Sequence, residues 1–208
     1  MIDPQCIQVV AFDCDGVMFD STLANQAYYN HLLAHIGQPE MTPAQFAFAH
    51  MHTVDEVLEF LIQDPDLRSE ARLYRRRMSY MSFIRHMVVE PTLKPLLANL
   101  KPVFKTAIAT NRTDTMDRVL SEHSLEGWFD IVVTASDVRR PKPHPEQLKV
   151  ILAHFNIKPD QMIFIGDSPL DGQAAQAAGV PFIAYRNSEL EAERCIESLE
   201  EIQVLLAL

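Results

Sequence analysis

The feature that most constrains the fold is a series of short apolar runs separated by helical patterns. The runs occupy residues 6–12, 103–109, 131–134, 162–165 and 182–185. The first is rich in β-branched residues and is followed by acidic residues and a glycine, which is typical of a buried strand. Strands that alternate with helices form a parallel sheet covered by helices on both faces. The sequence therefore predicts an α/β fold with a doubly wound parallel sheet.

Three helical patterns lie between the runs, at 113–123, 145–155 and 168–178. Pro145 stands at the first position of its pattern, where a helix tolerates proline. Gly179 follows the third pattern and has the place of a C′ glycine. In a sheet of this type, ligands bind at the carboxyl ends of the strands. We therefore expect the functional site at that edge.

Residues 20–90 differ from the rest of the chain because they contain no strand-like run. Thr53 and Glu56 have the spacing of a capping box ahead of an apolar helical pattern. This segment is predicted to be an all-helical cap domain inserted after the first strand. The core domain is then predicted to comprise residues 1–19 and 91–208.

The charge balance argues against several classes of partner. The chain has 208 residues, with 28 acidic and 18 basic side chains, and a formal net charge of −10. Nucleic acids and anionic membranes attract clustered Lys and Arg, so neither is expected as a partner. No apolar run approaches the ~18 residues of a membrane helix, and no signal-peptide pattern is visible. Three cysteines without C-x-x-C spacing fit a reducing compartment. We expect a cytoplasmic protein, with a monomer as the default.

Polar residues follow four of the predicted strands at the edge where a ligand is expected. They are Asp13 and Asp15, Thr110 and Asn111, Lys142, and Asp167 and Asp171. In an extended chain the side chains of Asp13 and Asp15 share one face. Two adjacent carboxylates repel each other, which favours a bound cation or a shared proton. Each residue alone could have an ordinary structural role. Polar residues at the ends of four strands, all at one edge of the sheet, favour a functional site instead.

These residues resemble the four motifs of the haloacid dehalogenase superfamily, in particular the phosphoglycolate phosphatase and β-phosphoglucomutase-like subgroup. In chain order the motifs are Asp13-x-Asp15-Gly16-Val17, Thr110, Lys142 and Gly166-Asp167-Ser168-x-x-Asp171. The resemblance covers nearly the whole chain, because residues 20–90 are similar to the helical cap of the family. It implies a Rossmann-like core and Mg²⁺-dependent phosphoryl chemistry.

The resemblance also implies roles for the four acids. Asp13 would be the nucleophile and form an aspartyl-phosphate, which divides one difficult step into two. The side chain of Asp15 would protonate the leaving oxygen and then activate water. Mg²⁺ would be held by the Asp13 carboxylate, the Asp15 backbone carbonyl and Asp167. Asp171 would be a support or a water-mediated ligand, although an acid in the first turn also suits the helix dipole.

Three further residues would bind the phosphoryl group in a member of this family. Lys142 would bind both the phosphate and Asp13. Thr110 and the Asn111 amide would donate hydrogen bonds to phosphoryl oxygens. Ser168 is interpreted as a helix cap and not as a nucleophile, because the sequence G-x-S-x-G is absent.

Asp15 separates the reaction types within the superfamily. Dehalogenases lack an acid at this position, and phosphonatases lack it and use a cap lysine. The chain has Asp15 and no lysine between Met18 and Glu90. The resemblance therefore implies a phosphatase that acts on a small phosphorylated metabolite. Two alternatives stay open, a phosphomutase of the β-phosphoglucomutase type and a non-catalytic protein that binds a phosphorylated ligand or a protein partner.

The predicted cap carries side chains that suit substrate contacts. Six arginines lie between 68 and 85, at 68, 72, 75, 76, 77 and 85. We interpret them as a solvated basic face; the alternative is that one or two bind a substrate carboxylate or second phosphate. His50 and His52 flank Met51, and a cap histidine that touches substrate is favoured over a zinc site. The sequence does not indicate which phosphorylated substrate is bound.

Overall fold

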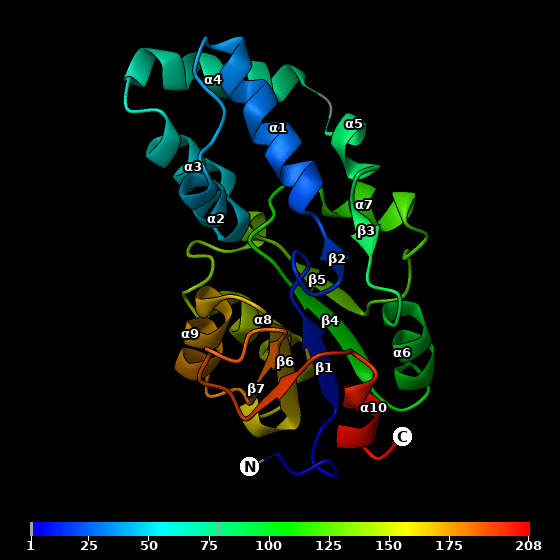
Figure 1. Cartoon of the computed structure of the whole chain (residues 1–208). Helices are drawn as coiled ribbons and strands as arrows, with labels where there is room; N and C mark the ends of the chain where they lie inside the picture. The colour runs from blue at the N-terminus through cyan, green and yellow to red at the C-terminus, as the bar shows by residue number, and fades with distance from the viewer. Residues whose placement is uncertain (1, 79) are drawn as a thin grey trace.

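The computed structural model describes residues 2–78 and 80–208, and its centre is a six-stranded sheet (Figure 1). The strand order is β5-β4-β1-β6-β7-β8, and every neighbouring pair is parallel. The strands are β1 Val9–Phe12, β4 Lys105–Ala109, β5 Ile131–Val133, β6 Met162–Gly166, β7 Phe182–Tyr185 and β8 Arg194–Ile196. The predicted parallel α/β fold is confirmed.

The order of the strands creates a crevice beside β1. From β1 the chain proceeds outward to β4 and β5, and it then returns to build β6, β7 and β8 on the other side. Phe12 is in register with Ile108 of β4 and with Ile165 of β6. The loops after these three strands therefore begin at the same level of the sheet. Ligands bind in such crevices, where the strand order reverses.

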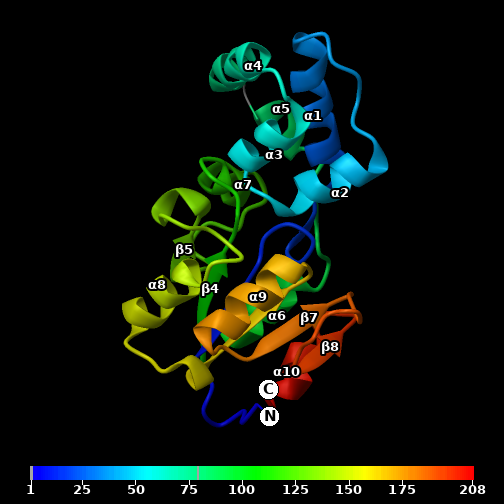
Figure 2. The ribbon, with the colours of Figure 1, turned by 90° about the vertical axis from the view of Figure 1, so that its left-hand side faces the viewer.

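The two faces of the sheet are covered by different helices, as alternation along β1 requires. Val10 and Phe12 belong to one buried cluster, and Val9 and Ala11 belong to the other. The first cluster includes side chains of α6 Leu93–Leu100, α7 Met116–Glu122 and α10 Glu201–Leu205. The second includes side chains of α8 Glu146–Phe155 and α9 Pro169–Ala178. Figure 2 shows α8 and α9 on the near side of the sheet and α6 behind it.

Five helices lie beyond the carboxyl ends of the strands and form what we call the cap (Figures 1 and 2). They are α1 Thr22–His35, α2 Pro43–Met51, α3 Val54–Leu61, α4 Pro65–Arg77 and α5 Met81–Ile84. The predicted capping box of Thr53 is confirmed at the start of α3. The predicted domain limits, 1–19 with 91–208 and 20–90, stay a prediction, and residues 1 and 79 lie outside the described part.

The prediction that residues 20–90 contain no strand was wrong. Phe19–Asp20 (β2) pairs antiparallel with Val88–Val89 (β3) where the chain enters and leaves the cap. Two residues are too few to give a periodic signal, so the sequence pattern could not reveal this ribbon. The edge strand β8 was also missed, since it begins with the exposed Arg194. Among the described residues, no helix has the length and apolar character needed to cross a membrane.

Candidate active site

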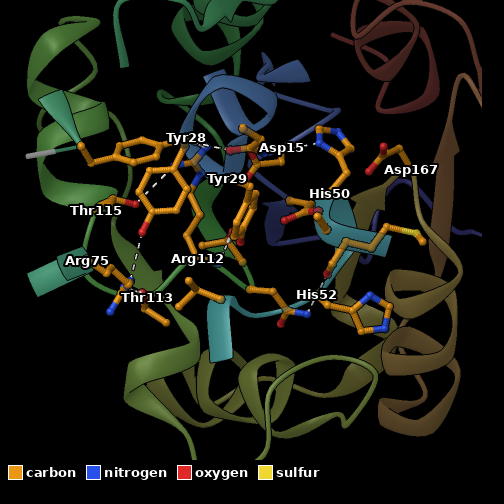
Figure 3. Close-up of a pocket in the computed structure, with 18 residues that line it drawn as sticks. Asp15, Tyr28, Tyr29, His50, His52, Arg75, Arg112, Thr113, Thr115 and Asp167 are labelled. Atoms are coloured by element: carbon orange, nitrogen blue, oxygen red, sulfur yellow. Dashed lines mark hydrogen bonds and ion pairs between the residues drawn. The ribbon is translucent and has the colours of Figure 1, made fainter. Parts of the chain in front are cut away.

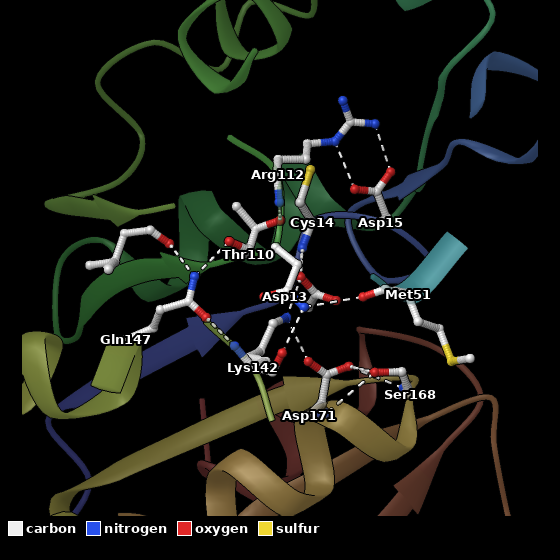
Figure 4. Close-up of polar contacts among 12 residues, drawn as sticks. Asp13, Cys14, Asp15, Met51, Thr110, Arg112, Lys142, Gln147, Ser168 and Asp171 are labelled. Atoms are coloured by element: carbon white, nitrogen blue, oxygen red, sulfur yellow. Dashed lines mark hydrogen bonds and ion pairs between the residues drawn. The ribbon is translucent and has the colours of Figure 1, made fainter. Parts of the chain in front are cut away.

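Loops from four parts of the core meet at the carboxyl end of the sheet (Figure 4). Asp13 and Asp15 follow β1, Thr110 and Asn111 follow β4, and Asp167 and Asp171 follow β6. Lys142 comes from the segment that precedes α8. The structure thus brings together all seven residues that the sequence singled out, because the strands that carry them are neighbours in the sheet.

Lys142 lies between two carboxylates in the floor of the site. Its Nζ is 2.8 Å from Asp13 Oδ1 and 2.6 Å from Asp171 Oδ1. Its side chain is only 3% exposed. Burial alone would lower the pKa of Lys142, but the two carboxylates raise it above its usual range. Lys142 therefore stays positively charged beside Asp13.

Two glycines allow the acids to approach the strand ends closely. Gly16 has a φ of +80°, and a Cβ at this position would overlap the Asp167 carboxylate. A Cβ at Gly166 would overlap the side chain of Asp171. Only glycine adopts a positive φ without strain and also leaves this space open. The glycines of the first and fourth motifs are therefore needed for the geometry of the acids.

Asp13, Asp167 and Asp171 form a cluster that could hold a metal ion. One carboxylate oxygen from each lies within 4.8 Å of the others. If all three carboxylates were ionised, their negative charge would exceed the positive charge of the single ammonium of Lys142 by two. Burial and then the charge of Asp171 raise the pKa of Asp13 to about 7 and that of Asp167 to about 8. A divalent cation that prefers oxygen ligands fits this donor set.

Asp171 is fully buried, and the protein engages both of its carboxylate oxygens. Oδ1 accepts a hydrogen bond from Lys142 Nζ at 2.6 Å. Oδ2 accepts one from the Ser168 amide at 3.1 Å and one from the Ser168 hydroxyl at 2.5 Å. Ser168 caps α9, which confirms its interpretation as a cap. This arrangement suits a residue that orients Lys142 and the start of α9.

Gln147 is a buried residue of the site that the sequence analysis missed. Its Nε2 donates to the Thr110 carbonyl at 2.6 Å, and its Oε1 accepts from the Lys142 amide at 3.3 Å. Asn111 Nδ2 also donates to the Lys142 carbonyl at 3.0 Å, and to the Met51 carbonyl of the cap at 3.2 Å. Amides thus connect the second and third motifs. The signal for Gln147 was its place in the first turn of α8, five residues after Lys142.

Arg112 is the second residue that was missed, and it binds Asp15 through two hydrogen bonds (Figure 4). Arg112 Nε donates to Asp15 Oδ2 and Nη2 donates to Oδ1, each at 2.7 Å. The side chains are only 8% and 14% exposed. Burial would raise the pKa of Asp15, but Arg112 outweighs it and lowers the pKa to about 2. Asp13 and Asp15 are therefore paired with different cations.

Side chains of the cap close a pocket of about 80 Å³ over these residues (Figure 3). Tyr80 accepts a hydrogen bond from Arg112 Nη2 at 3.2 Å and donates one to Asn25 Oδ1 at 3.0 Å. His50 also lines the pocket, and its Nδ1 lies 3.3 Å from Asn25 Nδ2. Among the residues that the structure describes, the Asp13 cluster is the only group of three or more metal-ligating side chains.

The cap arginines have different surroundings. Arg72 pairs with Asp55 and Glu59 on the surface of the cap. Arg75 instead lines the pocket. Its Nε donates to Tyr28 Oη at 3.1 Å, and its Nη2 donates to Asp114 Oδ1 at 2.9 Å. One of the six arginines therefore has the position that the alternative interpretation required.

Comparison with known proteins gives a consistent result. The family model of haloacid dehalogenase-like hydrolases matches residues 10–185. A phosphoglycolate phosphatase of Yersinia pestis is 28% identical over 194 residues, which are 88% of this chain and 82% of that protein. A pyrophosphatase of Bacillus pumilus is 29% identical over 182 residues, 83% of this chain and 80% of its own.

A solved structure agrees with these relatives. It is a haloacid dehalogenase superfamily hydrolase of Geobacter sulfurreducens, 39% identical, with a TM-score of 0.80 and 97% of each chain covered. The family match, the fold and the four motifs confirm the predicted family and the predicted enzyme class. The chain belongs to the haloacid dehalogenase-like hydrolases.

Proposed function

We propose that the protein is a Mg²⁺-dependent phosphatase that hydrolyses a small phosphorylated metabolite through an aspartyl-phosphate at Asp13. The observation that carries the proposal is the placement of Asp13 at the end of β1. There it lies against Lys142 and within 4.8 Å of ligand atoms of Asp167 and Asp171. A carboxylate, a fixed ammonium and further acids in one buried site match the needs of phosphoryl transfer. Of the relatives named above, one is a phosphoglycolate phosphatase and the other a pyrophosphatase, and both names describe hydrolytic release of phosphate.

In the first step Asp13 attacks phosphorus, and the bond from phosphorus to the leaving oxygen breaks. Lys142 and the Cys14 amide hold the Asp13 carboxylate in one orientation, with hydrogen bonds of 2.8 Å and 2.7 Å to Oδ1. The Thr110 hydroxyl, the Asn111 amide and Lys142 would donate to phosphoryl oxygens, where negative charge accumulates. The substrate is thereby positioned in line with the nucleophile.

Asp15 would move the protons of both steps. In its protonated form Asp15 would donate a proton to the leaving oxygen in the first step, and the resulting carboxylate would accept a proton from water when water cleaves the aspartyl-phosphate. Mg²⁺, held by Asp13, the Asp15 carbonyl and Asp167 with Asp171 as a support, would supply positive charge that allows an anionic nucleophile to approach an anionic phosphoryl group.

Release of inorganic phosphate from a panel of phosphorylated metabolites, including 2-phosphoglycolate, tests the proposal. With Mg²⁺ the protein should release phosphate, and Asp13→Asn or a chelator should abolish the release. A phosphomutase would instead keep the phosphoryl group on its product, and a binding protein would hydrolyse no ester. No turnover of any ester above the Asp13→Asn background contradicts the proposal.

A further inference from the structure

Two arginines from different parts of the chain line the pocket beside the phosphoryl site (Figure 3). Arg112 belongs to the loop after β4, and Arg75 belongs to α4 of the cap. Both share the pocket with Asp13 and Thr110. The pocket therefore holds two guanidinium groups that have no part in the proposed phosphoryl chemistry.

Arg112 is enclosed so completely that it needs an anion. Its side chain is 8% exposed, and hydroxyls of Tyr80 and Thr115 surround it at 3.2 Å. Hydroxyls alone do not compensate the charge of a buried guanidinium, and an uncompensated buried charge is costly. In the structure the compensating anion is Asp15, at 2.7 Å.

The ion pair between Asp15 and Arg112 conflicts with the proton transfers proposed for Asp15. Both of its carboxylate oxygens accept hydrogen bonds from Arg112, and Oδ1 also accepts one from Ser21. A carboxyl group that serves a leaving oxygen must direct one oxygen at the substrate. The pair must therefore open during turnover. Once it opens, Arg112 requires another anion in the same place.

We infer that the substrate provides this anion as a carboxylate, which binds Arg112 in place of Asp15 and so frees Asp15 for the reaction. The inference rests on the proposed phosphatase function and assigns its substrate class, a small phosphorylated carboxylic acid. Arg112 already holds a carboxylate with its Nε and Nη2, and this planar arrangement of donors suits a carboxylate. Tyr80 and Arg75 line the same pocket and add a hydroxyl and a second guanidinium, which also pairs with Asp114.

A pair of esters tests this assignment on the unaltered enzyme. 2-Phosphoglycolate and 2-hydroxyethyl phosphate have the same length and differ in a carboxylate against a hydroxymethyl group. We expect kcat/KM for phosphate release to be at least about 30-fold higher for the carboxylate, which corresponds to about 2 kcal/mol for a charge that loses its partner. Equal values, or a faster reaction of the neutral ester, overturn the inference and leave the phosphatase proposal intact.

Two further outcomes distinguish a failure of the carboxylate assignment from a failure of the proposed function. If ethylene glycol bisphosphate reacts faster than 2-phosphoglycolate, the second anion is a phosphate and the assignment of a carboxylate is wrong. If no ester of any kind releases phosphate, the proposed function fails and the inference falls with it. Preference for the carboxylate over both other esters supports the inference.

Variants of the arginines test whether Arg112 and Arg75 cause the preference for the carboxylate ester. Arg112→Gln should reduce the ratio of kcat/KM between the two esters to near one, and Arg75→Gln should reduce it by a smaller factor. Arg77→Gln, an exposed arginine of α4 outside the pocket, should leave the ratio unchanged. The ratio within one variant is insensitive to a general loss of active protein. If Arg112→Gln does not fold, Arg112→Lys retains the charge, loses the paired donors and should still reduce the ratio. An unchanged ratio in the folded Arg112 variant contradicts the inference.

Discussion

The active site has two halves that differ in how their charged groups are held. In the core half, Asp13 and Lys142 lie on loops anchored at strand ends, and Lys142 is enclosed by two carboxylates. In the cap half, Arg75 donates a hydrogen bond to Tyr28 of α1, and Arg112 donates one to Tyr80, which precedes α5. The fixed half suits chemistry common to many phosphate esters, and the half closed by the cap suits selection among them.

Asp13 and Asp15 illustrate this difference, although they are only two residues apart in the chain. Asp13 turns to Lys142 in the floor of the site, and Asp15 turns to Arg112 beneath the cap. In the proposed reaction the first pair can persist, because Lys142 would contact the phosphoryl group without leaving Asp13. The second pair would have to open for Asp15 to transfer protons in the proposed reaction. In the proposed reaction, the short loop after β1 thus carries one residue whose ion pair persists and one whose ion pair opens.

The largest effect is expected when the ion pairs of the two halves are broken in turn. Lys142→Met leaves Asp13 and Asp171 without their buried cation, so the free energy of unfolding should fall by about 3–5 kcal/mol. Arg75→Met is the matched change in the cap half. Its partner Asp114 is 69% exposed, so the loss should be about 0–1 kcal/mol. Urea unfolding of both variants measures the difference, and equal losses would contradict the expected difference between the buried pair of the core half and the exposed pair of the cap half.

A smaller effect is expected from pH, and it concerns the core half alone. Without metal, Asp13 and Asp167 have folded pKa values of about 7 and 8, whereas in the unfolded chain their pKa is about 4. The folded state therefore binds more protons between these values. The free energy of unfolding of the metal-free protein should consequently fall as pH rises from about 4 to about 8.

Metal binding should replace these protons. The apparent affinity for Mg²⁺ should accordingly increase by at least about tenfold from pH 6 to pH 8. Titration calorimetry at several pH values measures it. An affinity that does not change over this range would show that the carboxyls of the cluster are already ionised without metal.

The smallest effect is expected from one hydroxyl in the cap half. Tyr80→Phe removes a donor to Asn25 and an acceptor for Arg112, so kcat/KM should fall by about fivefold, equivalent to about 1 kcal/mol. Tyr74→Phe breaks a tyrosine hydrogen bond of the same kind, to His31 on the outer part of the cap. It should leave kcat/KM unchanged. A similar loss in both variants would mean that the cap acts only through its stability.

The core half could be predicted from the sequence because sheet topology decides it. In a doubly wound parallel sheet the carboxyl ends of the strands lie at one edge. The residues that follow these ends, Asp13, Lys142 and Asp167, therefore lie close together. The positions of the motif residues could therefore be predicted without knowing how the helices pack. The roles assigned to them, the monomeric state and the cytoplasmic location stay predictions.

The cap half could not be predicted in the same way. Periodicity indicates which face of a helix is apolar, but it does not show how that helix packs on another domain. Arg112 directly follows Asn111, yet its partner Asp15 lies 97 residues away, and the pairing depends on how two loops cross. Arg75 and Tyr80 reach the pocket only through the packing of α4 and α5. The ribbon of β2 and β3 was missed because it is too short to show a pattern.

The most direct test of the central claim is to trap the phosphorylated enzyme. The protein is mixed with Mg²⁺ and a substrate from the phosphate-release screen and is quenched with acid within one turnover. Mass spectrometry of its peptides then locates the phosphoryl group. We predict that Asp13 carries it and that the Asp13→Asn variant carries none. Turnover that leaves Asp13 unmodified throughout, with the phosphoryl group on another residue or on none, would contradict the account.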